Sequence, residues 1–433
     1  MISRSLVRLQ QKHVVVGGGI AGLTTAFNLL AQSCEDLVTL VEKAPDVAQG
    51  ASSKNGGLLC PSLDYPWTNN SVVDIYDLNN GILPRAITSP KTSPVRFRPS
   101  SLTNTSVLDF GMNWVGRAQN SEPIGALMQY SMGLYKNEPQ FAGLDFDQGL
   151  AKGTLIDGNL DERDSSGDIK KFCIGLKDIL LKEHGGVGGR FRILTNKRIG
   201  KAVTEGDEVV ELRVRDENLG TMSSVVGDSF VVAAGTGSKG IVGDIGVACP
   251  TVPVKGYLLT FSSTTEVTCN MKLPNKMFVA PMGVDEEGGK FIYRCSGLAE
   301  FGGAEMGVDW EGKERIVGDT DRAALDQMRG VVCEDFADVQ VIDEDYGFRC
   351  LAPDDVPLIG RTKYQNLYLN TGHGSKGWTM GAGSGKLCAQ LILGMQTDLD
   401  PSWYDPLRFQ ARKDFGLLGG GAEFGQKAKL QNA

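Results

Sequence analysis

Residues 14–34, VVVGGGIAGLTTAFNLLAQSC, carry the strongest structural signal in the chain. The run starts as a buried strand, turns at Gly17, Gly19 and Gly22, and continues as an apolar helix over 20–33. A second buried strand over 37–42 ends in Glu42. Strand, glycine turn, helix and acid-tipped strand within about 30 residues predict a Rossmann-like dinucleotide-binding unit. A secretory signal is the rival interpretation, but glycines interrupt the continuous helix that a signal needs.

The spaced glycines have different physical roles in such a unit. Gly17 makes the tight turn, Gly19 lets backbone amides approach a pyrophosphate at the positive end of the helix, and Gly22 allows close packing of helix and strand. Glu42 is expected to accept hydrogen bonds from the adenosine ribose hydroxyls and to disfavour a 2′-phosphate. This fingerprint serves NAD and FAD equally well, so it does not choose between them.

Composition narrows the class of protein. A chain of 433 residues allows about two to three domains. Its formal charge of −8 offers no basic footprint, so nucleic acid is not an expected partner. Nine scattered cysteines without a CxxC pair predict neither a disulfide framework nor a metal site. They favour a reducing compartment, the cytoplasm, and the acid-free leader 1–12 leaves a short mitochondrial presequence open. Apart from residues 14–34, which the glycines interrupt, no uncharged apolar run approaches the about 18–20 residues that a membrane span requires.

Further elements follow from periodicity and turn residues. Helices are predicted over 168–184 and 320–336, and strands over 190–195, 208–215 and 229–234. Residues 61–100 have the composition of a long loop, and 107–135 show helical spacing at Leu108, Met112, Trp114 and Val115. Strand-like stretches between 250 and 345 predict a second sheet domain.

A second glycine turn lies near the carboxyl end of the chain. Thr371–Thr379, TGHGSKGWT, separates a buried strand from a long apolar helix that Gly394 ends. A helix start of this kind presents free amides, and in a flavoenzyme it would stabilise the negative charge that develops at the N1–C2=O end of the reduced flavin. An NAD-dependent dehydrogenase would not account for this second turn.

Several motifs taken together resemble one family. They are the 14–30 stretch with Val41–Lys43; GASSKNGGLLCPS from Gly50; VVAAGTGS from Val231; PVKGYLLT from Pro253; GLAEFGG from Gly297; and the block from Gly347 to Leu387. This set resembles the FAD-dependent D-amino acid dehydrogenases, within the wider group of D-amino acid oxidase, glycine oxidase and sarcosine oxidase. The resemblance implies an α/β fold with an α+β second domain: a Rossmann-like FAD-binding domain (1–62, 166–250 and 346–415) interleaved with a mixed-sheet substrate domain (63–165 and 251–345), before a flexible tail, 416–433.

The resemblance also implies a set of site residues. FAD is expected at Gly17, Gly19, Ile20, Ala21, Gly22, Glu42, Lys43, Ser52, Ser53, Ala234, Gly235, Gly372, His373, Gly374, Gly377, Trp378 and Thr379. Arg349 is expected to bind the substrate carboxylate, for which a planar guanidinium suits bidentate contact. Tyr257 is a candidate pocket wall or carboxylate partner. His373 is a candidate acid or base, although its glycine neighbours favour a positioning role.

Two departures from the family pattern concern the substrate end. Cys350 stands where relatives place a proline, which is expected to shift the loop that presents Arg349. The stretch between Thr154 and Gly167 is shorter than the family leads one to expect, which alters the predicted roof of the pocket.

The resemblance implies oxidation of the CH–NH2 group of a D-amino acid to a 2-oxo acid and ammonia, by hydride transfer to flavin N5. The electron acceptor is expected to be a quinone-type molecule or oxygen, with peripheral membrane contact left open. Glycine, sarcosine or another secondary amine is the alternative substrate. A protein that keeps the nucleotide fold without catalysis is the alternative of another class.

Overall fold

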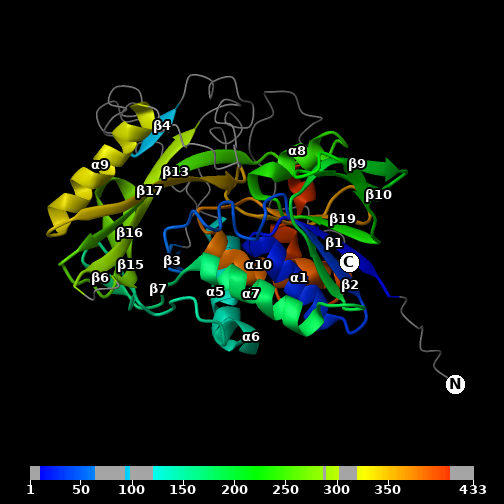
Figure 1. Ribbon diagram of the computed structural model, residues 1–433, viewed down its shortest axis with the longest axis horizontal. Helices are drawn as coiled ribbons and strands as arrows, with labels where there is room; N and C mark the ends of the chain where they lie inside the picture. The colour runs from blue at the N-terminus through cyan, green and yellow to red at the C-terminus, as the bar shows by residue number, and fades with distance from the viewer. Residues whose placement is uncertain (1–9, 64–92, 98–119, 286–288, 302–318, 410–433) are drawn as a thin grey trace, which may run out of the picture.

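The computed structural model describes residues 10–63, 93–97, 120–285, 289–301 and 319–409. Two large sheets dominate it, a mostly parallel one and a mixed one, side by side in Figure 1. The helices are α1 Ile20–Gln32, α5 Ser121–Asn137, α6 Pro139–Ala142, α7 Ile169–His184, α8 Ser238–Gly243, α9 Asp319–Asp335 and α10 Gly377–Leu393. Within the described ranges no helix is both long and apolar enough to span a membrane.

The mostly parallel sheet contains the first glycine turn. Its strands, in spatial order, are β18 Leu358–Arg361, β19 Leu367–Thr371, β12 Ser229–Val232, β1 Lys12–Val16, β2 Leu37–Val41 and β8 Phe191–Leu194. Both faces of this sheet are covered, which explains why β1 and β2 are apolar runs rather than alternating ones. Val15 packs with α1, α7 and α10, whereas Val14 and Val16 face the other layer.

Helices α1 and α10 cross at close range. Thr24 Oγ1 in α1 donates a hydrogen bond to the Gly381 carbonyl of α10 at 2.8 Å. A Cβ at Gly385 would overlap the Thr24 side chain. The glycines in α10 therefore let the two glycine turns of the chain, each at the start of one of these helices, lie near each other.

The opposite face of the parallel sheet carries a small antiparallel sheet. It consists of β9 Lys197–Glu205, β10 Glu208–Asp216 and β11 Met222–Val225. Leu212 and Val214 of β10 pack with Val14 and Val16 of β1. This layer completes the core beneath the first glycine turn.

The mixed sheet is built from the middle of the chain. Its path is β20 His373–Gly374, β17 Gln340–Leu351, β13 Val252–Ser263, β16 Phe291–Phe301, β15 Met277–Val284, β14 Asn270–Leu273, β5 Thr154–Ile156 and β6 Asn159–Asp161, with β4 Val95–Phe97 beside β16. A separate short pair joins β3 Leu58–Leu59 to β7 Ser165–Ser166. Helix α9 covers one face (Figure 1). Its Leu325 and Met328 pack with Tyr257 and Tyr293 of the sheet.

The predicted helices over 20–33, 168–184 and 320–336 are confirmed, as is the mixed second sheet. Asp168 caps α7, because its carboxylate accepts hydrogen bonds from the Lys170 and Lys171 amides. Most of the predicted loop over 61–100, the four apolar residues between 108 and 115, and the predicted tail lie outside the described residues.

Candidate active site

A cavity of about 870 Å³ lies between the two sheets. Its walls come from the carboxyl ends of β1, β2, β12 and β19 and from the face of the mixed sheet that lies opposite α9. This volume is at the upper end of the range for small-molecule and cofactor sites. The cavity joins both glycine turns to Arg349, so one long ligand and one small one can share it.

The glycines of the first turn are needed for two different reasons, close backbone packing and space for a ligand. Gly17 has φ of +107°, and a Cβ there would lie 2.5 Å from the Ala233 carbonyl oxygen. A Cβ at Gly22 would overlap the Gly17 carbonyl oxygen. A Cβ at Gly19, by contrast, would meet only Ser52 Oγ, at 3.2 Å. The protein itself therefore requires Gly17 and Gly22, whereas Gly19 leaves space for a ligand above the start of α1.

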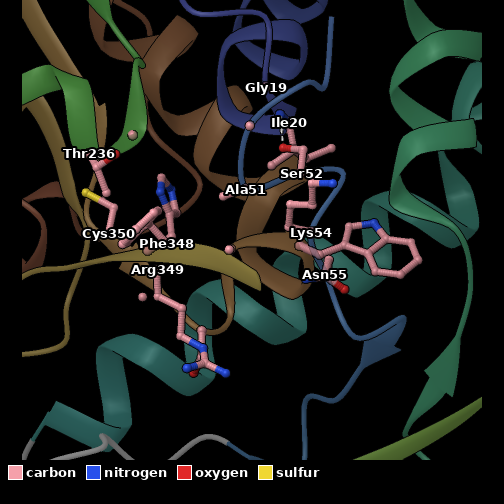
Figure 2. Close-up of a pocket in the computed structure, with 18 of the residues that line it drawn as sticks. Gly19, Ile20, Ala51, Ser52, Lys54, Asn55, Thr236, Phe348, Arg349 and Cys350 are labelled. Atoms are coloured by element: carbon pink, nitrogen blue, oxygen red, sulfur yellow. Dashed lines mark hydrogen bonds between the residues drawn. The ribbon is translucent and has the colours of Figure 1, made fainter. Parts of the chain in front are cut away.

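Ser52 lies beside this helix start. Its Oγ accepts a hydrogen bond from the Ile20 amide at 3.1 Å, as drawn in Figure 2. The neighbouring Ser53 donates to the Gly50 carbonyl at 2.9 Å and stabilises the turn of the loop. Ser52 lines the cavity and Ser53 does not.

Glu42 is held at the end of β2 by the turn that it faces. One carboxylate oxygen accepts the Gly18 amide at 2.6 Å, and the other accepts the Ala44 amide at 2.8 Å. An ionised carboxylate has about four acceptor positions, so two remain for hydroxyl donors. Glu42 and Lys43 both line the cavity, where the adenosine end of a dinucleotide is expected.

Four residues that line the cavity each have a buried polar side-chain atom without a hydrogen-bond partner among the described residues. The atoms are Thr236 Oγ1, Asn370 Oδ1, His373 Nε2 and Trp378 Nε1. An unsatisfied buried polar atom costs about 1–3 kcal/mol, so a cluster of four indicates that a polar ligand completes the site. Together with the space at Gly19, these atoms fit FAD, whose flavin ring and ribityl chain carry both donors and acceptors.

His373 is neutral at neutral pH. Burial lowers the pKa of its imidazole to about 4. One ring nitrogen of a neutral imidazole donates and the other accepts, so His373 can hydrogen bond a ligand without adding a charge. At the helix start beside it, Lys376 forms a buried ion pair with Asp355 at 3.1 Å.

The loop after Ser52 connects the two sheets. Lys54 forms an ion pair with Asp345 of β17, and Arg294 of β16 donates to the Asn55 carbonyl at 3.2 Å. A Cβ at Gly56 would overlap Ser296. Residues 52–57 therefore contact the first glycine turn at one end and the mixed sheet at the other (Figure 2).

Arg349 extends from β17 into the cavity. Its Nη1 donates to the Leu298 carbonyl at 2.7 Å and its Nη2 donates to the Gly297 carbonyl at 3.3 Å. Burial lowers the pKa of the guanidinium to about 10, which still leaves it charged at neutral pH. A fixed, planar cation in a cavity is suited to binding a carboxylate through two parallel hydrogen bonds.

Tyr257 borders the cavity, but its hydroxyl points to another region. The oxygen lies 2.9 Å from Glu300 Oε2 and 2.8 Å from Asp321 Oδ1, at the interface with α9. Burial, reinforced by the two carboxylates, raises the pKa of this phenol. The hydroxyl is therefore bonded on the α9 side of the sheet, whereas Arg349 lies on the cavity side.

The residues around Cys350 form a regular strand rather than a loop. Strand β17 pairs with β13 without interruption from Asp343 to Leu351, and Cys350 lies opposite Pro253. In Figure 2 Arg349 and Cys350 extend to opposite sides of the strand, as neighbours in a strand do. The Cys350 thiol lies 3.6 Å from Thr371 Oγ1.

Every predicted site residue except Gly22 and Ser53 lines the cavity. Sequence reasoning missed Thr236 and Asn370, which follow or end strands at the predicted cofactor path and had only that position as a signal. It also missed Leu298, which lies in a quoted motif but has no side-chain chemistry to draw attention. In the described part of the chain, no group of three or more His, Cys, Asp or Glu side chains is placed to hold a metal ion.

Comparison with protein families gives one match across most of the chain. The model of the FAD dependent oxidoreductases matches residues 12–391. Among curated proteins, a D-amino acid dehydrogenase of Bradyrhizobium diazoefficiens is 27% identical and the match covers 90% of this chain and 97% of that protein. A D-amino acid dehydrogenase of Dechloromonas aromatica is 26% identical, with 89% and 97% covered.

Solved structures agree in fold. An L-amino acid deaminase from Proteus vulgaris superposes with a TM-score of 0.56 at 17% identity, covering 93% of this chain and 98% of that chain. A glycine oxidase from Geobacillus kaustophilus superposes with a TM-score of 0.58 at 14% identity, covering 92% and 99%. At these identities the likeness is one of fold, and it includes enzymes with different substrates.

Proposed function

Because the chain belongs to the family of FAD-dependent oxidoreductases, we propose that it oxidises the CH–NH2 group of a D-amino acid to the 2-oxo acid and ammonia. The observation that carries this proposal is the presence of Arg349 in the cavity that holds both glycine turns. Two curated relatives named D-amino acid dehydrogenase, each matched over nearly the whole chain, support the choice of substrate.

The residues of the first turn would hold the pyrophosphate and adenosine of FAD. Gly19 leaves the space, Ile20 and Ala21 begin the helix whose amides face it, and Glu42 would accept from the ribose hydroxyls. Thr236, Asn370, His373 and Trp378 would bond the flavin end. When bound, FAD would supply the acceptor for the hydride, which carries both electrons away from the amino acid.

Arg349 would fix the other reactant. A bidentate contact to the carboxylate leaves the amino acid rotation about one bond only, so the Cα hydrogen can be directed at the flavin end of the cavity. His373 is neutral, so it would not repel a protonated amine on arrival. Its role in the proposal is to position the flavin end rather than to carry a proton.

We further propose a quinone-type electron acceptor, on the strength of the relatives named dehydrogenase. Oxygen is the other outcome of the test below.

The cysteines support a reducing compartment, the cytoplasm, because all nine lie in described ranges and are free thiols.

The experiment is a product analysis with matched enantiomers. Purified holoenzyme is incubated with D- or L-alanine, glycine or sarcosine, in the presence of a quinone dye or of oxygen alone. Equal amounts of pyruvate, ammonia and reduced dye from D-alanine only are expected. Turnover of sarcosine or L-alanine in preference would reassign the substrate within the family, and hydrogen peroxide without dye would make the protein an oxidase.

A further inference from the structure

Strand β16 contains a bulge opposite the strand that Arg349 crosses. In the register with β13, Gly297 pairs with Tyr257 and Glu300 pairs with Lys255. Leu298 and Ala299 therefore face Gly256 together, two residues against one. A bulge of this kind bends its strand and redirects the groups that it carries.

The bulge holds Leu298 in a conformation that leucine rarely adopts. Its φ is +52°, in the left-handed region, and its side chain is only 3% exposed. Only a few per cent of residues other than glycine have positive φ, and Asn, Asp and His are enriched among them several-fold. The leucine side chain is retained in the apolar cluster beneath α9, so packing offsets this backbone strain.

The redirected group is a carbonyl. In a regular antiparallel strand the Leu298 carbonyl would lie in the plane of the sheet and point at a neighbouring strand. Here it accepts from Arg349 Nη1 at 2.7 Å, and the Gly297 carbonyl accepts from Nη2 at 3.3 Å. The two carbonyls fix the plane of the guanidinium.

The facing strand leaves room for this arrangement. A Cβ at Gly256 would overlap the guanidinium carbon and both terminal nitrogens of Arg349. The side chain thus lies across the Gly256 backbone on its way from β17 to β16. The bulge and this glycine form a slot for the arginine.

We propose that Leu298 is a positioning residue: its left-handed backbone sets the direction in which Arg349 presents its hydrogen-bond donors to the substrate carboxylate. This rests on the proposed function, in which Arg349 binds that carboxylate. The prediction is distinctive, because the side chain and the backbone of Leu298 then have separable roles, one in stability and one in affinity.

Two substitutions separate these roles. Leu298→Ile keeps the volume and apolarity of the side chain, but a β-branched residue tolerates positive φ poorly and is expected to leave the left-handed region. Leu298→Gly removes the whole side chain, but glycine adopts positive φ freely. The first variant therefore disturbs the carbonyl, and the second disturbs the core.

The melting temperature and the FAD content of each holoenzyme are measured first. Calorimetry then gives the dissociation constant of benzoate, a simple carboxylate. KM and kcat for the amino acid are measured on the same preparations. The two variants are expected to rank in opposite order for melting temperature and for benzoate affinity. Leu298→Gly has the lower melting temperature, with a benzoate constant within about threefold of the parent. Leu298→Ile has the higher melting temperature of the two variants but binds benzoate about tenfold or more weakly. This loss of affinity is about that expected when one hydrogen bond is misaligned. KM is expected to rise by a larger factor than kcat falls.

A ranking in which affinity follows melting temperature would overturn the proposal, because a merely structural leucine gives that result. If either Leu298 variant fails to fold, Gly256→Ala replaces it; it is expected to weaken benzoate binding with FAD content unchanged, and unchanged binding would contradict the slot. Arg349→Ala distinguishes failure of the proposed function from failure of the proposal about Leu298. Equal benzoate binding by this variant and the parent would reject the carboxylate site itself, whatever the Leu298 variants show.

Discussion

The two ends of the cavity are built in opposite ways. At the end proposed for FAD, amides at the start of α1 and the carboxylate of Glu42 come from one continuous stretch of chain, and a missing side chain at Gly19 creates the space. At the end proposed for the substrate, a single side chain, Arg349, is held by carbonyls of β16 while crossing β13. The first end relies on local backbone geometry, and the second on the register of three strands.

This difference has a consequence for how each end tolerates change. A local turn that binds through its backbone is damaged by almost any added side chain, because the side chain overlaps either the backbone, as at Gly17 and Gly22, or the space proposed for the ligand, as at Gly19. Replacing an arginine held across strands is expected to leave the fold intact and to affect only the ligand that we propose it binds. The predictions below use this contrast, from the most damaging change to the mildest.

The largest effects are expected within the first glycine turn, and they differ between neighbours. Gly22→Val should prevent folding, because its Cβ would overlap the Gly17 carbonyl oxygen. Gly19→Val should fold, since only Ser52 Oγ lies near its Cβ, but should lose FAD. Absorbance of bound flavin and circular dichroism measure both. A Gly19→Val protein that retains full flavin content would refute the assignment of this space to the cofactor.

Replacing Arg349 should affect the substrate end alone. Arg349→Ala is expected to raise the Kd of a carboxylate ligand roughly 30- to 4000-fold, which corresponds to about 2–5 kcal/mol for losing a buried charge contact. FAD content should remain at the parent level. Arg349→Lys is the matched control, because it keeps the charge without the bidentate geometry. Its Kd is expected to lie between those of the parent and Arg349→Ala. An unaltered Kd in both variants would exclude Arg349 from carboxylate binding.

His373 should leave a signature in stability at acid pH. Its folded pKa of about 4 lies below the ordinary value of 6.5, so between these values the unfolded chain binds more protons. The contribution of His373 to the free energy of unfolding should therefore fall as pH drops from about 6.5 to about 4, by up to about 3 kcal/mol, and should be constant above 6.5.

His373→Gln removes the titrating group at this position and should flatten that part of the stability curve. The chain has three histidines, so the missing resonance in the NMR spectrum of the variant also assigns His373 in the parent. A His373 resonance that titrates near pH 6.5 would contradict a buried, neutral imidazole.

Tyr257→Phe should have the smallest effect on ligands. The lost hydroxyl bonds Glu300 and Asp321 on the α9 side of the sheet, so stability should fall by about 1–3 kcal/mol while the Kd of a carboxylate ligand changes less than about twofold. Thermal unfolding and calorimetry on the same preparation give both values. A large loss of carboxylate affinity would return Tyr257 to the substrate site.

The comparison of the two ends also explains what the sequence can predict. Gly17, Gly19, Gly22 and Glu42 form a pattern with fixed spacing, because one strand, one turn and one helix determine the geometry of the cofactor end. The same holds for the turn before α10, where His373 and Trp378 line the cavity.

The substrate end depends on information that local patterns lack. Which face of a strand a side chain occupies follows from register, and a single bulge reverses it. Because side chains alternate between the two faces of the sheet, Arg349 lies in the cavity and the Tyr257 hydroxyl lies on the α9 face. The bulge brings the Leu298 carbonyl to Arg349. The roles of the individual site residues and the division into interleaved domains stay predictions.

The most direct test of the central claim is the visible spectrum of the purified protein under anaerobic conditions, before and after addition of a D-amino acid. The account predicts a flavin band that is bleached by D-alanine, stays bleached in the parent until a quinone dye is added, and is bleached in Arg349→Ala only at much higher amino acid concentration. A colourless protein, or a flavin band that no amino acid bleaches, would contradict it.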